Sequence, residues 1–273
     1  MSEKISVRAY AKINLFLRIL SAENGYHKIE SLQQSVDLFD EVTLCKSSGK
    51  KITSDFPEDN SLVVLKRIAE KYSLGGMRLF VKKNIPIGGG LGGSSADAAA
   101  AALACARLWG LDEEEVKALV APLFGDLAFQ LTGGTALTRG FGEIVEPLKP
   151  LPEYHVLLCF PKEGVLTKDA YALSDKTPRG DGDPFFVYDA LQNKTNATAY
   201  YTNDLLPAAA LLNKEILPLL GALKDDEACL YGMSGSGSTL FALYTNKEAA
   251  LKKANSLPCR TLLTRTITPN LAK

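Results

Sequence analysis

The sequence is poor in the residues that disulfide scaffolds and metal centres require. Its 5 cysteines are odd in number, widely spaced and without a C-x-x-C pair, and it has 2 histidines. This usage favours reduced thiols in a cytoplasm over disulfides or zinc, and it excludes a histidine-rich metal site. No apolar run approaches the length of a membrane span, and the first residues lead directly into a strand pattern. We therefore expect a cytoplasmic protein that consists of the whole chain.

A net charge is also lacking, since 31 basic side chains balance 31 acidic ones. Without a global field to attract nucleic acid or an anionic membrane, we expect neither as a partner. An anionic substrate must instead be held by a local site. The length of 273 residues and the hydrophobic content of 46% predict a globular protein with two domains or one large one.

Glycine, by contrast, is concentrated in one stretch. Pro86 to Gly93, here named the glycine loop, contains 5 glycines that leave backbone N–H groups uncovered, and residues 97–103 are strong helix formers. Ser94 and Asp97 stand at capping-box spacing, although Ser95 is an equally good cap. Unpaired donors and the positive end of the helix dipole coincide there, which favours a bound phosphate group. The predicted cradle consists of Pro86, Ile87, Gly88, Gly89, Gly90, Leu91, Gly92, Gly93, Ser94, Ser95 and Ala96.

Two alternatives to a phosphate cradle stay open. Gly88, Gly90 and Gly93 satisfy the dinucleotide pattern G-x-G-x-x-G, and Asp112 to Glu115 supply acids at the required distance. Those acids open the next helix, however, whereas a ribose-binding acid should end a second strand. The other alternative is a glycine-rich surface turn without a ligand. The common P-loop is excluded because no G-K-[ST] ending follows.

Periodicity and turn signals predict interleaved strands and helices, the pattern of an α+β protein. The expected strands cover 5–11, 12–20, 41–45, 78–82, 154–160, 229–232, 239–244 and 260–268. The expected helices cover 61–72, 94–109, 112–123, 167–173, 207–223 and 247–254. We expect turns at Asn24-Gly25 and at Asp37 to Asp40, and a mobile loop at Arg179 to Pro184. A proline-marked linker, Lys149 to Pro152, is the expected boundary between domains 1–150 and 151–273.

A phosphate cradle without a Walker lysine still needs a cation and a group that activates the nucleophile. Lys12 is the favoured cation because small and apolar residues flank it, where a buried lysine would otherwise be costly; a solvated strand-face lysine is the alternative. Asp126 is the matching carboxylate, a lone acid that enters an apolar run, unless it is a plain helix N-cap. Tyr26 and His27 could stack on and hydrogen-bond a flat base, or be ordinary core or surface residues.

Six segments, taken in order, resemble the GHMP kinase superfamily. They are Ala11 to Leu15, Gly25 to His27, the glycine loop, Gly133-Gly134, Asn203 to Leu205 and Met233 to Gly237. The resemblance spreads from about residue 6 to residue 244. Ala-Lys-Ile-Asn-Leu together with Gly-Tyr-His most closely resembles the members that act on a cytidine diphosphate-linked methylerythritol in the non-mevalonate isoprenoid pathway.

The resemblance implies the GHMP kinase fold, with an N-terminal domain like the second domain of ribosomal protein S5 and a ferredoxin-like C-terminal domain. ATP and the small-molecule substrate would bind between them, and ATP would phosphorylate the 2-hydroxyl of that substrate. By motif match, Asp126 would take the proton from the hydroxyl and Lys12 would stabilise charge. The matched substrate positions are Asn14, Tyr26, His27, Thr167 and Tyr171. Mg²⁺ is expected with ATP, but the motifs do not identify its ligands or an oligomeric state.

The chain departs from the superfamily pattern in three places. Two glycines rather than three precede Ser94-Ser95, so which serine meets phosphate stays open. The usual Gly-Ala-Asp-Val-Pro-Phe-Phe becomes Phe124 to Gln130, so Asp126 is assigned through its distance to Gly133-Gly134. Ser238 replaces a proline. The alternatives are therefore another GHMP kinase, of the mevalonate or homoserine type, and a non-catalytic binding module on the same fold.

Overall fold

A computed structural model describes residues 3–23, 25–56 and 60–269. The first sheet in this part of the chain has the strand order β3-β4-β2-β5-β6, with β1 also paired to β2. Its strands are β1 (Lys4–Glu23), β2 (Tyr26–Lys46), β3 (Ile52–Ser54), β4 (Met77–Lys82), β5 (Thr135–Gly140) and β6 (Ile144–Pro147). The predicted Asn24-Gly25 turn includes Asn24, which lies outside the described residues.

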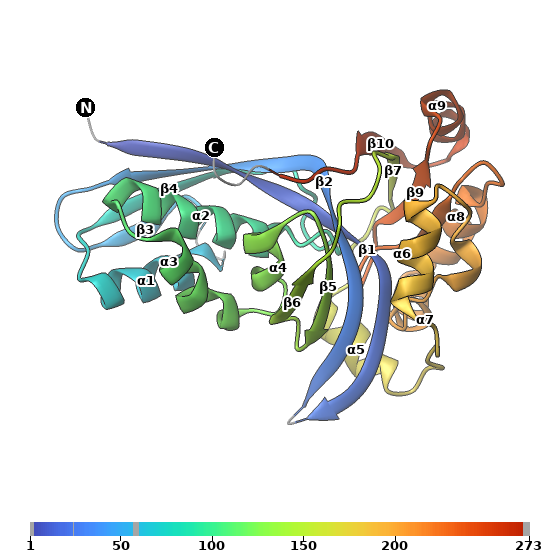
Figure 1. Ribbon diagram of the computed structural model, residues 1–273, viewed down its shortest axis with the longest axis horizontal. Coiled ribbons are helices and arrows are strands. Elements are labelled where there is room, and N and C mark those ends of the chain that lie inside the picture. The colour runs from blue at the N-terminus through green and yellow to red at the C-terminus, as the bar shows by residue number, and fades with distance from the viewer. Residues whose placement is uncertain (1–2, 24, 57–59, 270–273) are drawn as a thin grey trace.

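Two long strands connect the halves of the molecule. β1 and β2 pair antiparallel from Lys4 opposite Cys45 to Glu23 opposite Tyr26. Figure 1 shows them (blue) running along the long axis and curving beside the second half of the chain. The two predicted strands 5–11 and 12–20 are thus one strand. Residues 11–17 are all buried, because their apolar side chains belong to two successive hydrophobic clusters and the polar Lys12 and Asn14 are hydrogen-bonded to each other.

The predicted turn at 37–40 is wrong, since these residues continue β2. The two aspartates of this segment interact with distant residues that hold it in the extended strand. Asp40 is fully buried and accepts hydrogen bonds from the backbone N–H groups of Asn84 and Ile85, at 2.5 and 2.8 Å. Asp37 pairs with Arg265 at 3.2 Å. A turn signal read from local sequence was therefore overridden by long-range contacts.

Helices pack against the first sheet: α1 (Ser61–Tyr72), α2 (Gly93–Trp109), α3 (Glu113–Val120) and α4 (Leu127–Thr132), with the short η1 (Ala121–Leu123). α2 is the central one, because its alanines let it contact β1, β2 and the three neighbouring helices closely. It ends at Gly110, as predicted, with a left-handed φ of 64°. Its start differs from the prediction, since the cap is Gly92 and makes no side-chain hydrogen bond. Ser94 and Ser95 therefore lie in the first turn rather than at the cap.

The second sheet has the antiparallel order β10-β7-β9-β8. Its strands are β7 (His155–Phe160), β8 (Leu230–Met233), β9 (Leu240–Tyr244) and β10 (Arg260–Arg265). Numbered by appearance in this half, the order is 4-1-3-2, which is the ferredoxin-like arrangement that was expected. The helices here are α5 (Thr167–Ser174), α6 (Pro184–Gln192), α7 (Leu206–Leu212), α8 (Ile216–Leu223) and α9 (Lys247–Ser256), besides η2 (Thr198–Tyr200) (Figure 1).

Two helix predictions in this half need correction. The helix expected over 207–223 is two helices, because the Asn213 side chain accepts from the backbone N–H of Glu215 and donates to the carbonyl of Glu163. α6 was not predicted, and it begins at Pro184 inside the expected loop. Its start carries a recognisable signal, since the Asp183 carboxylate caps the N–H of Phe185 just before a proline at the first helical position.

The two sheets are joined rather than separated. The strands of one end at Pro147 and those of the other begin at His155, so the predicted boundary at 150 falls between them. One hydrophobic cluster nevertheless combines Ala11 and Ile13 of β1 with Leu158 of β7. The α+β architecture is confirmed, while the division into two domains stays a prediction. None of the described helices combines the length and apolar character needed to cross a bilayer.

Candidate active site

A cleft of about 380 Å³ opens where the two halves of the chain meet. Its walls come from β1, the glycine loop, the starts of α2, α4 and α5, and the loop Ser234 to Ser238 between β8 and β9, here named the serine loop. The predicted site residues that line it are Lys12, Asn14, Pro86 to Ser95, Asp126, Thr167 and Tyr171. Ala96, Tyr26 and His27 are not among its lining residues.

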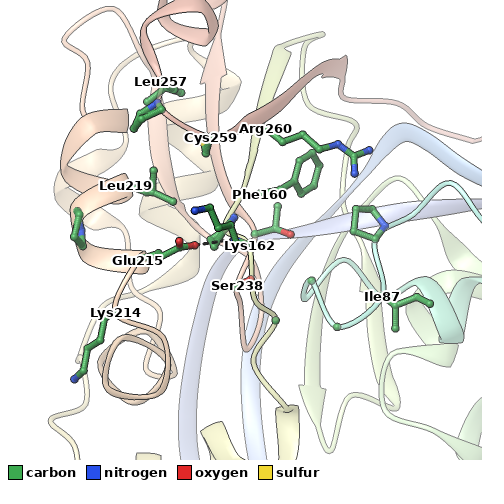
Figure 2. A pocket seen from close by; sticks show the side chains of 18 residues that line it. Ile87, Phe160, Lys162, Lys214, Glu215, Leu219, Ser238, Leu257, Cys259 and Arg260 are labelled. Atoms are coloured by element: carbon green, nitrogen blue, oxygen red, sulfur yellow. Dashed lines mark hydrogen bonds between the residues drawn. The ribbon is translucent and has the colours of Figure 1, made fainter.

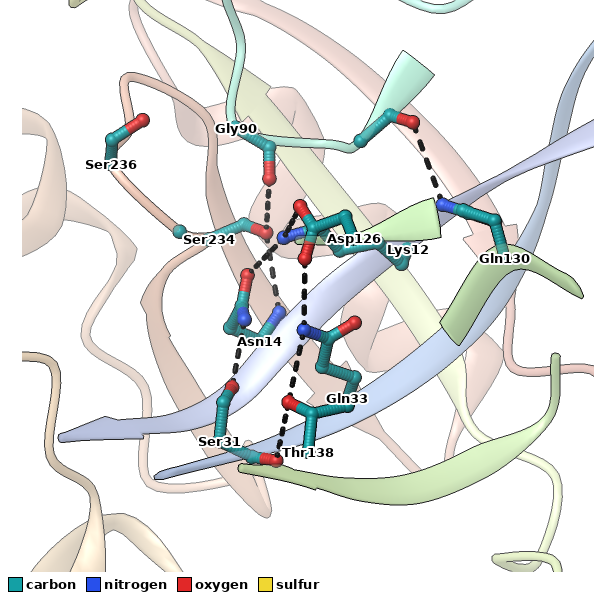
Figure 3. A network of polar contacts seen from close by, with 12 residues as sticks. Lys12, Asn14, Ser31, Gln33, Gly90, Asp126, Gln130, Thr138, Ser234 and Ser236 are labelled. Carbon is teal, nitrogen blue, oxygen red and sulfur yellow. Dashed lines mark hydrogen bonds and ion pairs between the residues drawn. The ribbon is translucent and has the colours of Figure 1, made fainter. Parts of the chain in front are cut away.

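Lys12 and Asp126 face each other in this cleft. Lys12 is 3% exposed, and its Nζ lies 3.3 Å from Oδ2 of Asp126 and donates to Oδ1 of Asn14 at 2.6 Å (Figure 3). Lys12 is therefore not a solvated strand-face lysine. Asp126 precedes α4, yet its side chain makes no capping hydrogen bond. The alternative of a plain N-cap is wrong as well, because the carboxylate turns toward the buried cation instead.

Polar residues of β2 form hydrogen bonds with Asp126 and Asn14, and they were not predicted as site residues from the sequence. The amide of Gln33 donates to Oδ1 of Asp126 at 3.1 Å and to the hydroxyl of Thr138 at 3.3 Å. Asn14 donates to the hydroxyl of Ser31 at 2.8 Å. The available signal was the spacing of Ser31 and Gln33, because residues two apart share one face of a strand. Ser31 and Gln33 are both fully buried, so their polar side chains face the site rather than solvent.

The glycine loop is held tightly against both halves. Gly90 and Gly92 have φ values of 73° and 70°, in the left-handed region that favours glycine. A Cβ at Gly90 would lie 2.2 Å from the carbonyl oxygen of Ser234, and one at Gly92 would lie 3.0 Å from Cε of Lys12. The hydroxyl of Ser234 donates to the carbonyl of Gly90 at 2.9 Å, and the N–H of Lys12 donates to the carbonyl of Leu91 at 3.0 Å. These glycines therefore permit close backbone approach.

A second cation, the half-buried Lys83, also lines the cleft and was not predicted. Its Nζ lies 2.5 Å from a carboxylate oxygen of each of Asp40 and Asp97, both of which are fully buried. Burial lowers the pKa of Lys83, but its hydrogen bonds to Asp40 and Asp97 and the negative charges of these two carboxylates together outweigh that effect and raise the pKa above the ordinary value. Asp97, proposed as part of a capping box, therefore serves as a partner of Lys83.

Of the expected substrate positions, Thr167 and Tyr171 line the cleft, whereas Tyr26 and His27 do not. His27 stacks on Tyr171 with ring centroids 5.2 Å apart, and its Nε2 lies 2.8 Å from Asp175, whose pKa is lowered mainly by that hydrogen bond. Burial, and then the negative charge of Asp126, raises the pKa of Tyr171. Thr167 is hydrogen-bonded to Ser236 of the serine loop at 2.9 Å. Tyr26 is 72% exposed near the end of the β1–β2 hairpin, outside the cleft.

The cleft combines the glycine loop at the start of α2, the Asp126 carboxylate, the buried Lys12 and the half-buried Lys83, which are the kinds of group that a phosphoryl-transfer site uses. Two family models match the chain: GHMP kinases N terminal domain over residues 60–135 and GHMP kinases C terminal over residues 189–262. The chain therefore belongs to the GHMP kinase family, whose kinases are small-molecule phosphotransferases.

Similar proteins and solved structures are named for the particular substrate on which they act. The chain is 34% identical to the 4-diphosphocytidyl-2-C-methyl-D-erythritol kinase of Thermosipho africanus, over 87% of this chain and 90% of that one. It is 35% identical to the kinase of the same name from Desulfitobacterium hafniense, over 92% and 91%. A crystal structure of 4-(cytidine 5'-diphospho)-2C-methyl-D-erythritol kinase superposes with a TM-score of 0.82 at 29% identity, over 97% of this chain and 100% of that one. A homoserine kinase from Cytophaga hutchinsonii, at 21% identity, covering 98% of this chain and 96% of that one, and with a TM-score of 0.69, shares the fold.

Proposed function

We propose that this protein transfers the γ-phosphoryl group of ATP to the 2-hydroxyl of 4-diphosphocytidyl-2-C-methyl-D-erythritol. The observation that carries the proposal is the contact of Lys12 with Asp126 at 3.3 Å beside the glycine loop, in a chain similar over most of its length to kinases of that name. It argues against a non-catalytic module, because a binding module needs no buried cation beside a carboxylate at the phosphate cradle.

In the proposed mechanism, the substrate hydroxyl binds beside Asp126, which accepts its proton as the oxygen attacks the γ-phosphorus. The new O–P bond forms while the bond from the γ-phosphorus to the β,γ-bridging oxygen breaks, and ADP leaves with that electron pair. Lys12 donates hydrogen bonds to the charged equatorial oxygens, and backbone N–H groups of the glycine loop and of the first turn of α2 hold the other phosphates. Gln33 and Asn14 keep Asp126 and Lys12 oriented for this step.

Mg²⁺ belongs to the proposal as the companion of ATP. Among the described residues there is no group of three or more acidic, histidine or cysteine side chains that could cage a metal. The cleft would suit Mg²⁺ held largely by phosphate oxygens and water, and the hydroxyls of Ser94 and Ser95, which line the cleft, would be protein oxygens available to it. Such an ion would supply charge neutralisation on the phosphates. The protein residues supply position and the remaining positive charge.

Substrate recognition is proposed to use His27, Tyr171 and Thr167, in line with the positions expected from the sequence. Tyr171 lines the cleft, His27 stacks on it from outside the lining, and the negative charge of Asp126 acts on the Tyr171 hydroxyl. A cytosine ring packed on this aromatic pair would place its attached diphosphate and sugar alcohol along the cleft toward Asp126. We propose that Asn14 acts mainly by orienting Lys12, and that Tyr26 contributes to the outer rim of the pocket.

The test is a coupled assay of ADP formation with three acceptors: the cytidine-linked substrate, homoserine and mevalonate. We expect activity with the first alone, and Lys12→Ala and Asp126→Asn should each lower kcat by at least about 100-fold. Lys82→Ala, an exposed lysine on β4, is the matched control and should retain wild-type turnover. Near-normal turnover of Asp126→Asn would remove that carboxylate from the mechanism, and preference for homoserine or mevalonate would reassign the substrate.

A further inference from the structure

A second and larger cavity, of about 920 Å³, lies on the other side of the glycine loop. It shares Pro86 to Gly89 with the candidate active site, but its other walls come from the C-terminal half alone. Those walls are the end of β7 and the loop that follows, the start of α8, the serine loop with Thr239, and the turn before β10. Its volume lies within the range of sites for small organic ligands.

The lining of this cavity combines apolar and basic side chains. Phe160 and Leu219 are apolar, Lys162 lies between them, and the Arg260 guanidinium lies 5.3 Å from the centroid of the Phe160 ring (Figure 2). Lys214 adds a third cation at the rim. A preformed pocket with apolar walls and a few charged groups selects a ligand with an apolar body and a charged end.

The charges of the lining indicate a dianion. Lys162, Lys214 and Arg260 have no ion pair among the residues that the structure describes, in contrast to Lys12 of the active-site cleft. The single carboxylate in the lining, Glu215, accepts a hydrogen bond from the backbone N–H of Lys162 at 2.7 Å. Three cations and one carboxylate leave two unbalanced positive charges. A phosphate monoester at neutral pH carries close to two negative charges, whereas a carboxylate carries one.

The walls are also rigid before a ligand arrives. Prolines stand at four places around the lining: Pro86, Pro161, Pro218 and Pro258. Because proline fixes its own φ angle, little backbone freedom is lost when such a wall is covered. On the glycine-loop side, the carbonyl of Gly89 accepts from the N–H of Thr239 at 3.2 Å, which ties the shared wall to the C-terminal half.

We propose that this cavity is a second ligand site, separate from the phosphotransfer cleft, that binds amphipathic phosphate monoesters. The hydrocarbon part packs on Phe160 and Leu219, and the phosphate is bound by Lys162 and Arg260. Arginine offers paired donors that match phosphate oxygens, and lysine adds a point charge. The site does not depend on which alcohol the kinase phosphorylates.

Cys259 provides a readout that is independent of catalysis, since it lines the cavity as a half-buried free thiol. Cys45, which is equally half-buried on β2, is the internal control. The experiment measures the rate of iodoacetamide labelling of each thiol by mass spectrometry, with octyl phosphate, octanoate, octanol or inorganic phosphate present. We expect octyl phosphate at about ten times its Kd to slow labelling of Cys259 about tenfold and to leave Cys45 unchanged.

Octanoate, octanol and inorganic phosphate should each protect Cys259 much less at the same concentration. Octanoate carries one negative charge rather than two, octanol carries none, and inorganic phosphate has no hydrocarbon chain. Lys162→Ala combined with Arg260→Ala should abolish protection, while Lys252→Ala, an exposed lysine of α9 outside the lining, should preserve it. Absence of protection, equal protection by octanol or octanoate, or protection that survives the double substitution would each overturn the proposal.

Discussion

The contact between the glycine loop and the serine loop can be tested with two alanine substitutions. Gly88 and Gly90 both have left-handed φ angles, 68° and 73°, so alanine is strained to a similar degree at each. Their surroundings differ. A Cβ at Gly88 would find nothing within 4 Å, whereas a Cβ at Gly90 would lie 2.2 Å from the carbonyl oxygen of Ser234 and 3.0 Å from that of Gly237.

The expected magnitudes follow from these surroundings. Alanine in the left-handed region costs about 1 to 2 kcal/mol at either position. At Gly90 the obstructing atoms are backbone and cannot rotate away, so the two loops must separate, and such overpacking costs a further 1 to 3 kcal/mol, roughly. Separation also breaks the hydrogen bond from Ser234 to the Gly90 carbonyl, worth about 1 kcal/mol. Gly88→Ala should thus lose about 1 to 2 kcal/mol and Gly90→Ala about 3 to 6 kcal/mol.

Equilibrium unfolding in urea without ligands is the appropriate assay, because Gly88 also lines the cleft and kinetics would mix binding with stability. The unfolding free energies should be compared only between variants whose m-values, the slopes of free energy against urea concentration, agree. A change in cooperativity is then not mistaken for a change in stability. Equal destabilisation by Gly88→Ala and Gly90→Ala would refute the argument, since backbone strain alone would then explain both variants and the close contact with the serine loop would contribute nothing.

Two further predictions concern buried charge and substrate recognition. Lys83→Met should lower the free energy of unfolding by about 3 to 5 kcal/mol, because Asp40 and Asp97 stay buried without their cation. The control Lys82→Met removes an exposed ion pair and should cost less than about 1 kcal/mol. Equal losses of unfolding free energy in urea titrations of the two variants would contradict this prediction. Since the folded pKa of Lys83 is raised, its stabilising contribution is complete below the ordinary pKa of 10.5 and is lost as pH rises through the folded value, so the gap between wild type and Lys83→Met should narrow above pH 10.5. His27→Ala should lower kcat/KM at least about tenfold on the cytidine-linked substrate but by less than about twofold on methylerythritol 4-phosphate, and equal losses on both would mean that His27 does not contact the base.

Contiguous features of the site could be predicted from the sequence, and distant contacts could not. Lys12 within an apolar strand and the glycine loop before an alanine-rich helix each carry their own local signal, and both line the cleft. The partners of Lys83 come from β2 and α2, so a pairing with Asp40 and Asp97 requires the fold to be known. The same reason explains the predicted turn at 37–40, where local residue preferences were outweighed by long-range hydrogen bonds.

The arrangement around Lys12 explains why so few residues specify the site. Burial of an ammonium group is costly, and here Asp126 and Asn14 compensate it directly, while Gln33 in turn fixes the orientation of the carboxylate. The absence of a side chain at Gly92 gives the lysine stem the room it occupies. In the proposed mechanism each group serves folding and chemistry together, since the interactions that stabilise the buried charge also hold it beside the glycine loop, where we propose that the phosphates of ATP bind. A cation and a base that are already oriented need little reorganisation during phosphoryl transfer, which is the condition for strong electrostatic stabilisation of the transition state.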